Sequence, residues 1–218
     1  MKINKSLLAA VVALALLPIA SHATGIVIGA PGTGGNCFPF GCSTGGDRYQ
    51  QVYAASDFAG PMSINDITFY DSMYPGNLSS GTFSLYLSTT SAAVNGLSAT
   101  MDDNLGANNA LFGTLVGGIV ANPSFTITGT SFAYDPGMGN LLLEIRSTGQ
   151  SGGSIFLDAR NGDAGGLFSR MHNYGGAFAE YGLVTGFNVG AVPEPGTVAL
   201  MLCGLAVTGI AARRRRAG

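Results

Sequence analysis

The sequence predicts an all-β protein with a single ectodomain of the β-sandwich or jelly-roll type, and three observations support this. Glycine is abundant, with 34 residues in 218, and only 10% of the residues are charged. Apolar and polar side chains alternate with a period of two along several stretches of the middle of the chain. Clusters of glycine, proline, asparagine and aspartate separate these stretches. Aliphatic and aromatic residues remain too frequent for a disordered chain, so a core is expected.

The clearest predicted strand covers residues 82–88, where Phe83, Leu85 and Leu87 would face the core. Residues 54–58 are compatible with one helical turn, and no window predicts an amphipathic helix of more than three turns. About eight short strands between turns are typical of a sandwich or jelly roll. Further strands of the same kind are predicted at residues 63–70, 124–128, 130–134, 140–147, 154–160 and 183–189.

The N-terminus has the order of a secretory signal peptide. Lys2 and Lys5 precede an apolar run at residues 7–17, and small residues at Ser21 and Ala23 follow it. We therefore predict a signal peptide at residues 1–23 with cleavage after Ala23. An uncleaved membrane anchor is the alternative, but the apolar run is short for a membrane span.

The predicted ectodomain, residues 24–191, is acidic. The chain from 24 to 192 contains no lysine, four arginines and eleven acidic residues, a net charge of −7. Proteins that bind nucleic acids neutralise phosphates with clustered lysine and arginine. Nucleic acid is therefore not expected as a partner.

The C-terminal tail, residues 192–218, has three consecutive parts. A proline-containing motif at 192–196 precedes an apolar segment at 197–212 and a basic end at 213–218. Sixteen helical residues at about 1.5 Å each would extend about 24 Å, slightly less than a bilayer core, and arginines that snorkel can supply the difference. We predict a transmembrane helix at 197–212 with its basic end in the cytoplasm.

This order of parts resembles the PEP-CTERM sorting signal. The resemblance implies recognition by an exosortase, a multi-pass membrane cysteine protease of Gram-negative bacteria, and then removal of the tail. Tails of this kind are also named after an ice-binding protein that carries one, which says nothing about ice here. An ordinary tail anchor is the alternative. The residues that match the motif and its basic end are Val192, Pro193, Glu194, Pro195, Arg213, Arg214, Arg215 and Arg216.

Residues 48–53 and 64–70 also look like the opening strands of ectodomains often found with such tails, which implies no activity.

Two cysteines, Cys37 and Cys42, lie in the predicted ectodomain, and Cys203 lies in the predicted span. An even number of cysteines in an exported domain favours pairing, so we predict a Cys37–Cys42 disulfide. The enclosed loop is short, and the bridge is expected to rigidify one turn and to add little global stability.

Calcium is the one cofactor that the sequence suggests, and no other is expected. Asp158, Asn161 and Asp163 place hard oxygen ligands close together in a predicted loop, although Asx-turns explain the same pattern. Residues 29–36 imitate the glycine spacing of a phosphate-binding loop. Gly35 and Asn36 stand where that loop needs Lys and Ser or Thr, so we predict a flexible N-terminal lead.

Evidence for catalysis is weak. His172 is the only histidine left after signal removal, it is expected in an exposed loop, and no Gly-x-Ser-x-Gly elbow is present. No feature singles out a pair of glycosidase carboxylates. Tyr70, Tyr74 and Tyr174 are candidates for stacking on sugar rings, with ordinary packing as the alternative.

The expected function is a structural or adhesive role, without catalysis, in an exported and exosortase-sorted protein of the cell surface or extracellular matrix. A carbohydrate-binding module is the alternative, followed by an extracellular hydrolase. The expected partners are the exosortase and the inner membrane during sorting, and extracellular polysaccharide afterwards.

Overall fold

A computed structural model of the chain describes residues 25–32, 34–42, 47–121, 123–161 and 165–188. Within these ranges the chain forms fourteen strands and three short 3-10 turns, and it contains no α-helix. None of the described segments is a helix long and apolar enough to cross a membrane. The predicted signal peptide, the predicted transmembrane helix and the whole sorting motif lie outside the described residues.

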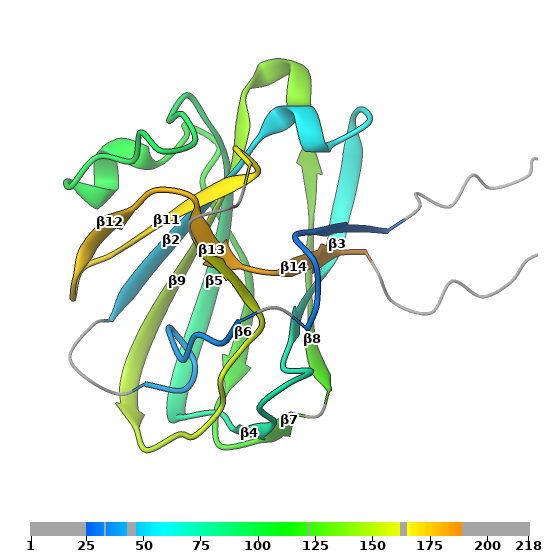
Figure 1. Ribbon diagram of the computed structural model, residues 1–218. Helices are drawn as coiled ribbons and strands as arrows, with labels where there is room; N and C mark the ends of the chain where they lie inside the picture. Colours follow the sequence, from blue (N-terminus) through cyan, green and yellow to red (C-terminus); the bar gives the residue numbers. More distant parts are fainter. Residues whose placement is uncertain (1–24, 33, 43–46, 122, 162–164, 189–218) are drawn as a thin grey trace, which may run out of the picture.

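Two antiparallel sheets face each other across the core (Figure 1). The larger sheet has six strands, and its order across the sheet is β12 (Gly176–Phe178), β11 (Phe168–His172), β2 (Arg48–Tyr53), β9 (Asn140–Ser151), β5 (Ser80–Thr90) and β6 (Ala110–Val116). The smaller sheet has four strands in the order β1 (Ile26–Ile28), β14 (Thr185–Phe187), β3 (Met62–Tyr70) and β8 (Ser124–Tyr134). This arrangement confirms the predicted all-β class.

Two short ribbons and three turns complete the domain. The ribbons pair β10 (Ala159–Asn161) with β13 (Tyr181–Leu183), and β4 (Gly76–Asn77) with β7 (Val120–Ala121). The 3-10 turns are η1 (Ala55–Asp57), η2 (Met101–Asn104) and η3 (Pro136–Met138).

Most of the predicted strands are confirmed. Phe83, Leu85 and Leu87 are fully buried on β5, as the alternation predicts. The runs at 63–70 and 140–147 fall within β3 and β9, and the turn expected at 54–58 contains η1. The two runs at 124–128 and 130–134 are one continuous strand, β8.

Two predicted strands are wrong in their extent. Within residues 154–160 only the start of β10 is a strand, and Phe156 and Leu157 make isolated bridges instead. Within residues 183–189 the chain leaves β13 at Leu183 and enters β14 at Thr185. In both regions the chain changes from one pairing strand to another, and the alternation of apolar and polar residues does not indicate where that change occurs.

Aromatic rings from both sheets fill the core. Phe40 packs against Phe69 and Phe125 of the smaller sheet and against Phe83 of the larger one, with ring centroids 5.1, 5.2 and 4.9 Å away. Edge-to-face and tilted contacts of this kind add to the hydrophobic stabilisation of buried rings. The core therefore depends on a residue that belongs to neither sheet.

The prediction of a flexible N-terminal lead at residues 29–36 is wrong. β1 pairs with β14, and Asn36 is buried and exchanges two backbone hydrogen bonds with Leu157, of 2.8 and 2.9 Å. Glycine permits this close docking: a Cβ atom at Gly34 would lie 2.8 Å from the Ala159 carbonyl oxygen. Gly34 thus serves the packing of this segment.

Candidate functional site

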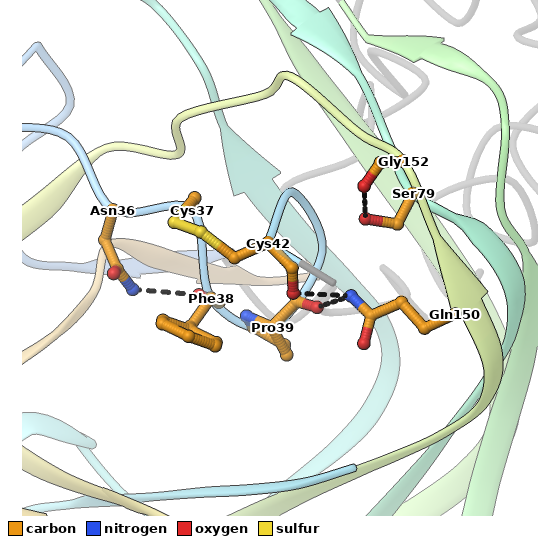
Figure 2. Close-up of a disulfide and its surroundings, with 8 residues drawn as sticks. All are labelled: Asn36, Cys37, Phe38, Pro39, Cys42, Ser79, Gln150 and Gly152. Carbon is orange, nitrogen blue, oxygen red and sulfur yellow. Dashed lines mark hydrogen bonds between the residues drawn. A yellow bond between two sulfur atoms is a disulfide. The ribbon is translucent and has the colours of Figure 1, made fainter. Parts of the chain in front are cut away.

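The predicted disulfide is present between Cys37 and Cys42, whose Cα atoms are 5.2 Å apart. Figure 2 shows the amide of Gln150 at the end of β9 holding this loop from one side. Its Nε2 donates to the carbonyl oxygens of Pro39 and Cys42, at 2.6 and 3.0 Å. The loop points Phe40 into the core, so it closes one end of the sandwich and does more than rigidify a turn.

Close approach of the disulfide loop to residue 155 requires a glycine. A Cβ atom at Gly41 would lie 2.1 Å from the carbonyl oxygen of Ile155, a distance that no side chain tolerates. Both Phe40 and Ile155 are fully buried. The six-residue loop is thus fitted to the sandwich end by its disulfide, by Gly41 and by Phe40.

Phe38, in the same disulfide loop, packs against aromatic side chains of the larger sheet and its edge. We call this group of rings the aromatic ledge: Phe38, His172, Tyr174, Phe178 and Tyr181. The rings of Phe38 and His172 are stacked, with centroids 5.0 Å apart and planes 14° apart. Phe178 stacks at 5.1 Å from His172. Tyr174 and Phe178 are 60% and 36% exposed, so part of the ledge is accessible to solvent.

His172 lies on β11 and is only 5% exposed, so the expected exposed loop position is wrong. Its Nδ1 accepts a hydrogen bond of 2.9 Å from the backbone N–H of Gly175. Burial first, and then the charge of Arg170, lower the pKa of His172 to about 4. The imidazole is therefore neutral at neutral pH and acts as one more aromatic ring.

Arg170 supplies the positive charge beneath the ledge. It is 4% exposed, and its guanidinium carbon lies 3.8 Å from the ring centroid of Tyr181 and 5.0 Å from that of Phe178. Within the described residues, its Nε and Nη1 atoms have no hydrogen-bond partner. The guanidinium thus makes cation–π contacts with two aromatic rings.

The ledge combines flat apolar surface with buried polar atoms, and such a surface suits the C–H face of a sugar ring. Tyr174 was among the predicted stacking residues, whereas Phe38 and Phe178 were missed. They come from the disulfide loop and from a three-residue strand, and no sequence pattern links those segments. Tyr74 and Phe156 form a second exposed pair, with ring centroids 6.3 Å apart, while Tyr70 is half-buried.

A cluster of charged side chains around Glu144 lies on the face of the larger sheet opposite to Arg170. The carboxylate of Glu144 on β9 is fully buried between two arginines. Its Oε1 accepts from Arg48 Nε at 2.8 Å, and its Oε2 accepts from Arg146 Nη2 at 2.7 Å. Gln50 and Asp102 extend this network. Both oxygens of Glu144 are therefore engaged in ion pairs.

The three predicted calcium ligands are in different surroundings. Asp158 is fully buried, and its Oδ2 accepts from the backbone N–H of Gly32 at 2.7 Å and from Ser72 Oγ at 2.6 Å. Asn161 is exposed at the end of β10, three residues further along the chain. Asp163 lies outside the described residues. Within the described ranges, no three His, Cys, Asp or Glu side chains converge as for a metal ion. A second buried acid, Asp71, was missed.

Comparison with known families concerns the C-terminal region. The PEP-CTERM protein-sorting motif matches residues 191–216. The chain carries a PEP-CTERM sorting signal. This confirms the resemblance seen in the order of motif, apolar segment and arginines. Searches among curated proteins and among solved structures found no match.

A PEP-CTERM signal implies an exported protein that an exosortase recognises and sorts through the membrane to the cell surface. The Cys37–Cys42 disulfide is compatible with such an address, because oxidising compartments preserve disulfides. The match begins at residue 191, shortly after β14 ends at Phe187. The PEP-CTERM signal thus follows the last strand of the sandwich with only a few residues between.

Proposed function

We propose that this chain is a non-catalytic structural or adhesive protein of the surface or extracellular matrix of a Gram-negative bacterium. In this proposal, residues 1–23 direct export and residues 197–212 hold the chain in the inner membrane. The exosortase then reads residues 192–196 and removes the tail. The PEP-CTERM match at residues 191–216 is the single observation that carries the sorting part.

The described ectodomain supports a role without catalysis. His172 is buried, and its Nδ1 is engaged by the backbone of Gly175, so it is poorly placed to relay a proton in a hydrolytic triad. The carboxylate of Glu144 is buried, and Arg48 and Arg146 engage its two oxygens, which leaves neither oxygen free to contact a substrate.

The sorting part is tested by fractionating cells that express the full chain, with mass spectrometry of the C-terminus. We expect wild-type protein at the surface to lack residues 213–216, and Glu194→Gln protein to stay full-length in the inner membrane. Asp103→Asn, which changes an exposed acid of the ectodomain, is the matched control and should sort normally. Surface protein that still carries the four arginines in wild-type cells would show a permanent anchor instead.

Carbohydrate binding is a second candidate, because the aromatic ledge includes two solvent-accessible aromatic residues, Tyr174 and Phe178. Loss of one stacking ring is expected to weaken binding about two- to tenfold. The test is binding of exported protein to polysaccharide purified from the matrix of the same cells. Tyr174→Ala should weaken it, and Tyr74→Ala, which removes a similarly exposed ring elsewhere, should not. Equal affinities of wild type and Tyr174→Ala would exclude the ledge as the binding surface.

A further inference from the structure

Two buried acids lie where the end of β3 meets the segment that leads into β10. Asp71 and Asp158 are both 0% exposed. The backbone N–H of Asp158 donates to the Tyr70 carbonyl oxygen at 2.7 Å, which fixes Asp158 beside the residue that precedes Asp71. The Ser72 hydroxyl, which follows Asp71, donates to Asp158 Oδ2 at 2.6 Å. The two carboxylates are therefore held in one small region by contacts on both sides of Asp71.

Three of the four carboxylate oxygens in this pair have no partner. Both Oδ atoms of Asp71 and Oδ1 of Asp158 are buried and receive no hydrogen bond from any residue that the structure describes. Only Oδ2 of Asp158 is satisfied, by Gly32 and Ser72. A buried carboxylate without a partner is strongly unfavourable, so the pair needs a positive group or a proton.

The electrostatics agree with an unmet demand for positive charge. Two carboxylates lie close together and away from solvent, and no cationic side chain of the described residues donates a hydrogen bond to either. The site is nevertheless close to solvent, because Ser72 and Gly32, which cover it, are exposed. A small ion therefore has a short path to the three free oxygens.

We propose that Asp71 and Asp158 together bind one Ca²⁺ ion. Calcium takes six to eight oxygen ligands in flexible geometry, and carboxylates, hydroxyls and water supply them. The three free oxygens would be its charged ligands, with the Ser72 hydroxyl and water available for other positions. Mg²⁺ demands stricter octahedral geometry and gives up its water reluctantly, so two carboxylates on separate segments suit calcium better. The ion would tie the N-terminal segment at Gly32 to the ends of β3 and β10.

The site fits an exported protein. Calcium sites of extracellular modules have dissociation constants of about 10⁻⁴–10⁻³ M. At a hundredfold excess over such a constant, the free energy of binding would raise the melting temperature of a domain of this size by roughly 5–10 °C. The effect is therefore measurable without knowing any ligand of the ectodomain.

The experiment uses the full chain in detergent, with calorimetric titration of Ca²⁺ and thermal unfolding in Ca²⁺, Mg²⁺ or EDTA. Wild type should bind Ca²⁺ and melt higher in Ca²⁺ than in EDTA. Asp71→Asn should lose this difference, and it should melt higher than wild type in EDTA because one buried charge has gone. Asp103→Asn is the matched control, since it neutralises an exposed acid on η2, and it should respond to Ca²⁺ like wild type.

Three results would overturn the proposal. The first is absence of Ca²⁺ binding in the wild-type titration, which needs no variant and so does not depend on how Asp71→Asn folds. The second is an equal response to Mg²⁺, which would remove the assignment to calcium. The third is an unchanged Ca²⁺ response in Asp71→Asn, which would place the ion elsewhere in the chain.

Discussion

Acidification is expected to destabilise the ectodomain through His172. The pKa of this buried histidine is lowered to about 4, below the ordinary value of 6.5. The unfolded chain therefore takes up a proton at a pH where the folded protein does not. The stability that depends on neutral His172 is complete above pH 6.5 and falls as the pH drops toward 4. From these two values, about 2–3 kcal/mol of the free energy of unfolding is lost between pH 7.5 and pH 4.5.

The matched variant is His172→Phe, which keeps a ring between Phe38 and Phe178 but cannot be protonated. Other groups also titrate in this range, so the measured quantity is the difference between wild type and His172→Phe in urea unfolding at the two pH values. Proton NMR of the imidazole gives the pKa directly. The chain has two histidines, and the other, His22, lies in the predicted signal peptide. A His172 resonance that titrates near pH 6.5, or equal acid sensitivity of both proteins, would refute the reasoning.

Three further predictions concern stability and are checked by urea unfolding. Phe40→Ala should cost about 3–5 kcal/mol, because the ring is fully buried among three others, and a loss below 1 kcal/mol would mean that the disulfide loop is not docked. Glu144→Ala should cost about 1–2 kcal/mol, because it removes the hydrogen-bonded partner of two arginines that are themselves partly exposed. A smaller loss is expected for Glu144→Gln, and equal losses would show that charge is not the cause. Replacing both Cys37 and Cys42 with Ser should cost about 2 kcal/mol, because the unfolded chain is no longer constrained by the short disulfide loop. A loss as large as that of Phe40→Ala would show that the disulfide is also needed to keep Phe40 in the core.

The strands were predictable from sequence where one face of a strand packs on the core along its whole length. In β5 the buried residues alternate with half-buried ones from Thr82 to Leu87, so the pattern of side chains reports the structure directly. At residues 154–160 the chain changes partner at almost every residue, from Tyr74 to Asn36 and then to β13. No periodicity survives such changes, and the prediction of one strand there was wrong.

The candidate sites were less predictable because they depend on distant segments. His172 looked exposed beside Asn173 and Tyr174, but Phe38 of the disulfide loop, far away in the sequence, and Phe178 stack on its ring. Asp71 and Asp158 are far apart in the sequence, and only the pairing of Asp158 with Tyr70 and Ser72 brings the two acids together. By contrast, the PEP-CTERM signal is continuous in sequence and was recognisable from its residues alone.

The position of β14 has a mechanical consequence for a protein tethered by its C-terminus. β14 is the last strand before the sorting signal, and it pairs with β1 on one side and with β3 on the other. A pull on Asn188 directed along the strand loads both ladders of hydrogen bonds together in shear, and they share the force instead of opening one after the other. β1 is antiparallel to β14, so the N-terminal end of the domain lies beside the point of pulling, at the Ile26 and Phe187 pair. A pull applied at the C-terminal end of the sandwich therefore enters it at a strand that is held by a neighbour on each side.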